Sequence, residues 1–304
     1  MAISQIKDFI NTQTTMNDTD YFPLQETAGT TKKTLWASIK SNLKAYFDTL
    51  YVSVSTGTSL KTASYVILDN DGITRVECDT TAGDMTITLP LKSNNRGRII
   101  EIANIKGGTY KVIIATNATD ATTLSNDALS VIWIPKIGDF VKLQESVNSG
   151  YWEIVNERIT SQLRIDTYAG YGSTDNKIMR FANSVENVGN MFSENHSTGY
   201  SGNAKGLEIT INKSGRYSIA VHSNSSASAS NMGLTLNASS LTTVINGCPS
   251  SEVLAFQTTA AGGSSGVVTI NLYFKKGDII RSQGTGDTPT TSGQCHFSCV
   301  YLGN

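Results

Sequence analysis

Residues 209–224, ITINKSGRYSIAVHSN, contain two alternating runs that are separated by the polar residues 213–215. In the second run, Tyr217, Ile219 and Val221 alternate with polar or small residues, which is the period of two expected of a half-buried β-strand. Two such strands joined by a polar turn that contains glycine predict a hairpin or a corner of a sheet. This stretch alone indicates local structure, and the fold class and the function have to come from the rest of the chain.

The length, charge and composition of the chain exclude several classes of protein. A length of 304 residues suits about two domains. Charged residues make up 16% of the chain, against roughly 25% in an average soluble protein. The formal net charge is −1 and no basic block is present, so we expect no nucleic-acid partner. No stretch approaches the roughly 20 apolar residues of a membrane span, and the N-terminus does not resemble a signal peptide; we expect no membrane insertion and synthesis in a cytoplasm.

The cysteines do not suggest a disulfide framework or a metal site. Two of them, Cys295 and Cys299, fall on one expected strand, where four residues span about 13 Å, too far for a disulfide. Asp175, Asp278 and Asp287 lack the spacing of a calcium loop. We therefore expect no metal and buried, unpaired thiols at all four cysteines: Cys78, Cys248, Cys295 and Cys299.

Residues 1–62 are expected to form an N-terminal segment with one short helix. Its large apolar residues recur at spacings of three and four, as in a heptad seam: Trp36, Ile39, Leu43, Tyr46 and Leu50. A helix of about 17 residues is marginal alone. The seam must therefore pack, either on its own domain or in a short self-associating bundle. Residues 52–64, rich in Ser, Thr and Gly, are interpreted as a linker.

The remaining chain is expected to form two β domains. In residues 63–158, short runs such as ITRVECD (73–79) are separated by turns containing Gly, Asn or Asp, which predicts a small central β-sandwich or barrel. Residues 156–166 are interpreted as a joint. In residues 159–304, runs such as VLAFQTT (253–259) alternate with long loops that carry little charge.

The C-terminal region resembles a known family. Its spaced residues are Phe181, Asn187, Phe192, Ile209, Gly215, Tyr217 and Ile219. This spacing is similar to the signature of the complement-collagen and tumour-necrosis-factor jelly rolls, although about ten extra residues lie between its two halves. Residues 272–281, LYFKKGDIIR, resemble that family's late-strand motif, and 297–302 its closing strand. The resemblance implies a ten-stranded jelly roll that forms a homotrimer, with Tyr217 and Ile219 at the trimer interface.

The front of the chain has a second resemblance. Residues 20–47 and 78–91, together with YAGYGSTDNKIMRF (168–181), are similar to segments that occur in this order in tail-fibre and head-fibre proteins of tailed bacteriophages. This resemblance implies a structural protein located in the virion. It also implies that the N-terminal segment binds other virion proteins.

Motifs for catalysis are lacking. The three histidines are His196, His222 and His296, and the sequence has no nucleophile elbow, zinc-binding helix or phosphate-binding loop. The carboxylates are dispersed, so a pair suited to glycoside hydrolysis cannot be identified. We expect a protein that is not an enzyme and has no cofactor, with a glycan hydrolase as a remaining alternative.

The polar loops of the C-terminal region are candidates for receptor binding. Tyrosines among Gly, Ser and Asn supply rigid contact area with a polar tip. The candidate residues are His196, Tyr200, Asn203, Asn224, Asn231 and Asp287. Low charge favours a host surface glycan or a neutral protein as the partner. The expected function is attachment of a trimeric tail or head fibre to the host. The alternative is a structural head or tail decoration, or a collar adaptor, without receptor binding.

Overall fold

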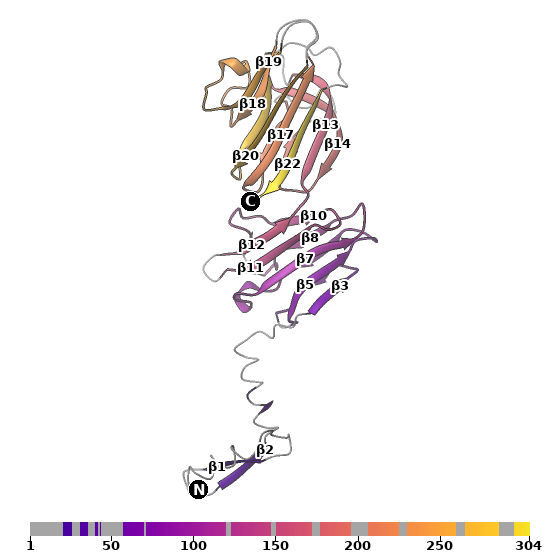
Figure 1. Ribbon diagram of the computed structural model, residues 1–304, viewed down its shortest axis with the longest axis vertical. Coiled ribbons are helices and arrows are strands. Elements are labelled where there is room, and N and C mark those ends of the chain that lie inside the picture. Colours follow the sequence, from indigo (N-terminus) through magenta and orange to yellow (C-terminus); the bar gives the residue numbers. More distant parts are fainter. Residues whose placement is uncertain are drawn as a thin grey trace. The chain divides into compact units, whose positions relative to one another are not determined.

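The computed structural model divides the chain into two compact units, Met1–Ser55 and Thr56–Asn304 (Figure 1). In the first unit, β1 (Tyr21–Gln25) pairs with β2 (Thr31–Leu35) as an antiparallel hairpin. The structure describes residues 21–25, 31–35, 40–41, 43, 57–69, 71–119, 123–146, 150–171, 177–195, 206–224, 230–259, 265–285 and 295–304.

Most of the expected helical seam lies outside the described residues. Leu43 is described: its backbone is helical and its side chain is 47% exposed within this chain. The seam residues that lie outside the described part are Trp36, Ile39, Tyr46 and Leu50. The helix and its self-association stay predictions.

The first half of the second unit is a short β-solenoid. Three strands stack in parallel in one sheet: β3 (Gly57–Lys61), β5 (Ile73–Asp79) and β7 (Ile99–Lys106). The strands that alternate with them stack in parallel in a second sheet: β4 (Tyr65–Val66), β6 (Met85–Thr88) and β8 (Val112–Ala115). The chain thus passes from sheet to sheet in successive coils.

Antiparallel strands close the solenoid. In one sheet, β10 (Val131–Ile134) adds to β8. In the other, β11 (Phe140–Glu145) adds to β7, followed by β12 (Tyr151–Arg158) and the short parallel strand β9 (Thr123–Leu124). The final orders are β10-β8-β6-β4 and β3-β5-β7-β11-β12-β9.

Two predictions for this region are corrected. The expected sandwich or barrel is a solenoid, because parallel and antiparallel strands share the same period of two, and the period does not reveal how strands connect. The expected linker at 52–64 contains β3, which pairs with β5 from Gly57 to Lys61. Polar composition alone did not distinguish an edge strand from a flexible connection.

The second half of the unit is a jelly roll of ten strands in two five-stranded sheets, ordered β14-β13-β22-β17-β20 and β15-β16-β21-β18-β19. The bounds of its strands are Gln162–Tyr171 (β13), Met179–Val188 (β14), Phe192–Asn195 (β15), Glu208–Ile211 (β16), Gly215–Asn224 (β17), Ser230–Leu236 (β18), Val253–Thr259 (β19), Ser265–Phe274 (β20), Ile279–Gly284 (β21) and His296–Gly303 (β22). The expected jelly roll is confirmed. Residues 156–166, interpreted as a joint, instead contain the end of β12 and the start of β13.

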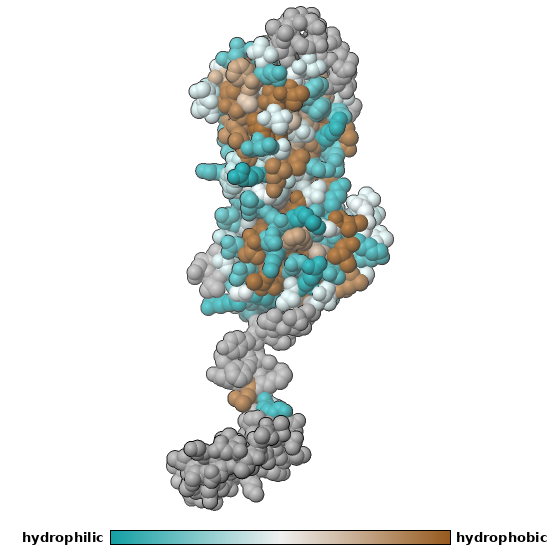
Figure 2. Space-filling model, in the orientation of Figure 1, coloured by the Kyte–Doolittle hydropathy of each residue, from teal (hydrophilic) through white to brown (hydrophobic). Residues whose placement is uncertain are grey.

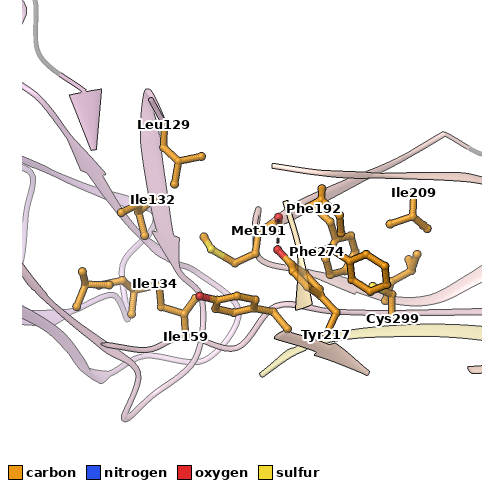
Figure 3. Close-up of a cluster of buried hydrophobic side chains, with 14 of the residues drawn as sticks. Leu129, Ile132, Ile134, Ile159, Met191, Phe192, Ile209, Tyr217, Phe274 and Cys299 are labelled. Carbon is orange, nitrogen blue, oxygen red and sulfur yellow. Dashed lines mark hydrogen bonds between the residues drawn. The ribbon is translucent and has the colours of Figure 1, made fainter. Parts of the chain in front are cut away.

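Tyr217 lies at the centre of an aromatic cluster inside the sandwich. Its ring centroid is 6.3 Å from Phe192, 6.1 Å from Phe274 and 5.1 Å from Tyr301. Figure 3 shows Tyr217 among Phe192 and Phe274, with its hydroxyl directed at Met191. That hydroxyl lies 2.9 Å from the Met191 carbonyl oxygen. Such aromatic pairs stabilise a core beyond the area that they bury.

Gly215 is required by the close approach of Tyr301. A Cβ atom at residue 215 would lie 2.6 Å from Tyr301 Cε2 and 2.9 Å from the carbonyl oxygen of Gly303. We predict that Gly215→Ala lowers the free energy of unfolding by about 1–3 kcal/mol, measured by chemical denaturation, because the added methyl group overpacks the core. The matched control is Gly150→Ala, whose Cβ would have no neighbour within 4 Å. Equal stability of both variants would contradict this account.

Candidate functional site

A buried charged cluster joins the solenoid to the jelly roll. Lys213, just before β17, has a side chain that is 1% exposed, and Glu157, near the end of β12, has one that is 6% exposed. The Lys213 Nζ donates to Glu157 Oε1 at 2.9 Å, to the Tyr301 hydroxyl at 2.5 Å and to Asn304 Oδ1 at 3.1 Å. All three donor positions of the ammonium group are therefore used.

Two hydrogen bonds to the same carboxylate oxygen hold the cluster. The Tyr301 hydroxyl also donates to Glu157 Oε1, at 2.5 Å. Burial, followed by the charge of Glu157, raises the pKa of Tyr301 above its usual value, so its hydroxyl keeps its proton. Removing two charges from water costs free energy that is recovered only with good geometry and additional hydrogen bonds. The cluster meets these conditions in part: Glu157 Oε1 accepts both hydrogen bonds, whereas Glu157 Oε2 is buried without a partner among the described residues.

A second contact lies beside the cluster. Asp127, in the turn after β9, accepts hydrogen bonds from the backbone nitrogen of Ser214 at 3.0 Å and from its hydroxyl at 2.7 Å. Lys276 donates to the Asp127 carbonyl oxygen. The residues that precede β17 therefore contact the solenoid through both their side chains and their backbone.

A third contact covers the edge of the solenoid. Asn190 lies in the turn between β14 and β15. It donates from Nδ2 to the Val131 carbonyl oxygen at 3.0 Å and accepts at Oδ1 from the Trp133 backbone nitrogen at 3.0 Å. The Asn190 amide thus binds the backbone of β10 as a neighbouring strand would. It satisfies one N–H group and one carbonyl group that an edge strand otherwise leaves unpaired.

The apolar core is continuous across these contacts. One buried cluster contains Ile132 and Ile134 of the solenoid as well as Phe192 and Tyr217 of the jelly roll. Figure 3 shows Met191 between the two groups. The two halves of the unit therefore share one core as well as their polar contacts.

The two ends of the jelly roll differ in their connections. Lys213 and Ser214 form the connection between β16 and β17 at the solenoid end. At the opposite end, Asn224 pairs with Ser265, and Ser230 pairs with Thr259. The connections that leave the strands there fall on residues 172–176, 196–205, 225–229, 260–264 and 286–294, which lie outside the described residues. The short connections 189–191, 212–214 and 275–278 therefore lie at the solenoid end, where the longer connection 237–252 between β18 and β19 also begins, and the other five connections leave from the far end.

The residues expected at the trimer interface have another role within one chain. Tyr217 and Ile219 have no exposed surface and belong to the core of the sandwich. Their prediction as contacts between subunits is wrong, because the alternation of β17 directs them towards the other sheet of the same chain. The side chains of β17 that face away from the core are those of even-numbered residues such as Arg216 and Ser218.

The receptor-binding candidates fall mostly outside the described residues. His196, Tyr200, Asn203 and Asp287 are in this group. Asn224 is described as the last residue of β17, but its side chain is not. Asn231 in β18 is half-buried, and its Oδ1 accepts a hydrogen bond from the Thr258 hydroxyl at 2.6 Å. The role of all six residues stays a prediction.

The described residues contain few groups suited to chemistry. Within them, no three His, Cys, Asp or Glu side chains are placed to hold a metal ion, and no helix has the length and apolar character of a membrane crossing. No disulfide joins the four cysteines: Cys78, Cys295 and Cys299 are buried, while Cys248 is half-buried rather than buried as expected. Burial raises the pKa of Cys78 to about 12, so this thiol stays protonated.

The junction is not evident from the sequence, although the sequence contains one signal for it. Ile209, Ile211 and Tyr217 are inward positions of the alternation, and Lys213 occupies an inward position between them. A charged residue at a core position requires a partner. Glu157 could not be identified as that partner, because it lies 56 residues away along the chain.

Comparisons with known proteins find a fold likeness alone. No protein-family model matches the chain, and no curated protein matches it. Among solved structures, the C-terminal jelly roll is similar to murine APRIL determined at pH 8.5, pH 8.0 and pH 5.0, with TM-scores of 0.33, 0.34 and 0.32. Each is 12% identical and covers 47% of this chain and 99% of its own.

Removing one member of the buried pair should destabilise the second unit. Lys213→Met leaves Glu157 charged and buried, and we predict a loss of about 3–5 kcal/mol in the free energy of unfolding, measured by urea denaturation. The additional change Glu157→Leu should restore much of this loss. As a control, Lys136→Met removes an exposed pair with Glu186 and should cost less than about 1 kcal/mol. An equally small effect at Lys213 would contradict the structural role of the cluster.

The stability of the jelly roll should fall in mild acid because of His296. The ring of His296 stacks on His222 with centroids 5.0 Å apart. Burial, followed by the charges of His222 and Arg164, lowers the pKa of His296, against the opposing charge of Asp166. Protons therefore bind the unfolded state first as the pH falls below about 6.5, and stability is lost from there towards the folded-state pKa.

The measurement is the melting temperature of the wild type and of His296→Gln between about pH 7 and pH 5. The variant should show a smaller decrease over this interval, since it lacks the group that the unfolded state protonates. Identical pH profiles would show that His296 does not contribute.

Proposed function

We propose that the protein is a structural subunit of a virion appendage, a homotrimeric tail fibre or head fibre of a tailed bacteriophage. Its N-terminal segment binds other virion proteins, and its C-terminal jelly roll attaches to a glycan or a protein on the host surface. The proposal brings together the two sequence resemblances and the arrangement of the second unit.

The observation that carries the proposal is the difference between the two ends of the jelly roll. At one end, Lys213, Ser214 and Asn190 connect the sandwich to the solenoid. At the other end, five connections leave the strands, and they include four of the six candidate residues. A rigid support with loops at its free end is the usual arrangement of a recognition surface.

The low charge of these connections favours a neutral partner. Residues 196–205 contain one lysine, residues 172–176 and 286–294 contain one aspartate each, and residues 225–229 and 260–264 contain no charged residue. Affinity for a repeated surface glycan would come largely from three copies that bind together.

The experiment that tests attachment uses virions that carry the altered protein. Replacing residues 196–205 and 286–294, which contain four of the candidate residues, with Gly-Ser segments of equal length should leave assembly unchanged and reduce adsorption to host cells. The control places the same kind of replacement in residues 147–149 of the solenoid. Normal adsorption of both virions would reject attachment through this end and favour the decoration or adaptor role.

The trimer should be visible in the solution mass. The full chain should have a mass of about 98 kDa by light scattering, three times 32.6 kDa. The surface that a trimer would bury is expected on the outer face of β20 and β22, where Val267, Tyr273 and Leu302 are 54%, 57% and 56% exposed. Hydrophobic residues gather in this part of the face drawn in Figure 2. Large exposed apolar groups of this kind often mark interaction sites.

A charge placed on this face should separate the subunits. We predict that the double variant Val267→Glu and Tyr273→Glu sediments as a monomer, because two carboxylates per chain would have to be buried without partners. Ile137→Glu, at a position that is 57% exposed in the solenoid, is the control and should remain trimeric. A monomeric wild type would reject the trimer, and a trimeric double variant would reject this face as its interface.

A further inference from the structure

A crevice of about 300 Å³ lies where the four-stranded solenoid sheet meets the end of β14. Its walls come from both halves of the unit: Trp133 lies in β10, Pro135 follows β10, and Val188 ends β14. Crevices at domain junctions, with apolar walls and a few polar groups, are common positions for ligands. This crevice is separate from the far-end connections described above.

Trp133 is held as a fixed aromatic wall of the crevice. In β10, Ile132 and Ile134 point into the core, and Trp133 between them points outward and is only half-buried. Its backbone nitrogen is bound by Asn190. The Lys111 Nζ lies 4.6 Å from the centre of its ring. A large aromatic residue that is anchored by its backbone and still partly exposed is suited to contact a ligand.

The charged groups around Trp133 are balanced. The Lys111 Nζ lies 2.8 Å from Asp84 Oδ2, and the Lys136 Nζ lies 3.5 Å from Glu186 Oε1. Each ammonium group therefore has a carboxylate beside it, which disfavours a polyanion as the ligand. Each also has further N–H donors, which can bind neutral oxygen atoms.

Asn187 adds an amide group to the same wall. Its Nδ2 donates to Glu194 Oε1 at 3.1 Å, which fixes the orientation of the side chain at the edge of the crevice. The crevice thus combines one aromatic surface with an amide and two ammonium groups.

We propose that this crevice binds a neutral pyranose unit of a polysaccharide. The C–H groups on one face of a pyranose carry partial positive charge and pack on the negative face of an indole ring, while its hydroxyl groups accept and donate hydrogen bonds at the rim. Trp133 supplies the stacking surface; Lys111, Lys136 and Asn187 supply the polar contacts. The site does not depend on the proposed attachment through the far end.

The test uses the full chain and the methyl glycosides of glucose, galactose, mannose and N-acetylglucosamine. Saturation-transfer NMR should detect binding of at least one of them, and calorimetry should give its affinity. Trp133→Ala should weaken that affinity at least about tenfold, since the stacking surface is lost. The matched control is Tyr110→Ala, an aromatic residue that is 44% exposed in the solenoid but does not line the crevice.

A second variant keeps Trp133 and fills the crevice. Gly108 lines the crevice, and a Cβ at this position would meet no atom within 4 Å. Gly108→Phe should abolish binding, and an unchanged melting temperature is the check that the variant folds. Absence of binding by all four glycosides would overturn the proposal. Binding that survives both variants, or binding of a proline-rich peptide in place of the glycosides, would also overturn it.

Discussion

The ion pair between Lys213 and Glu157 is the constraint on which the second unit depends. Both side chains are almost fully buried, so neither can exchange its partner for water without a large cost. The pair forms only when the beginning of β17 lies against the end of β12. It therefore selects one arrangement of the jelly roll on the solenoid out of the many that apolar packing alone would allow.

The neighbouring contacts are consistent with this arrangement. Asp127 binds Ser214, the residue next to Lys213, and Asn190 binds β10 on another part of the junction. Tyr301 connects the junction to the aromatic cluster, since its hydroxyl binds Glu157 and its ring lies beside Tyr217. The polar contacts of the junction and the apolar packing of the core therefore meet at the side chain of Tyr301.

Strand positions were largely predictable from the sequence, and strand connections were not. The alternation of residues 73–79 predicts that Val76 and Cys78 face inward, and both are fully buried in β5. The same alternation occurs in parallel and antiparallel sheets, so the coiled path of β3 to β8 was not evident. The jelly roll was predictable only because several spacings agreed with those of a known family.

The candidate site was less predictable than the fold. The sequence places Lys213 in a polar turn, but its burial depends on strands that are distant in sequence. Tyr217 was assigned to a subunit interface because the family resemblance suggested it, whereas its inward position in β17 places it in the core of one chain. The alternation of residues along a strand predicts which side of the sheet a residue faces. It does not predict whether that side packs against the same chain or against another chain.

The parallel winding of the solenoid allows its length to change during evolution in units of one coil. Each coil adds one strand to each sheet and meets only the coils beside it, so a coil can be duplicated or deleted without altering the junction at β10 and β12. Each such event changes the distance between the β3 edge and the jelly roll by one strand spacing, about 4.8 Å. Related proteins would then differ in this distance by whole multiples of the strand spacing, and each would carry the same jelly roll at its C-terminal end.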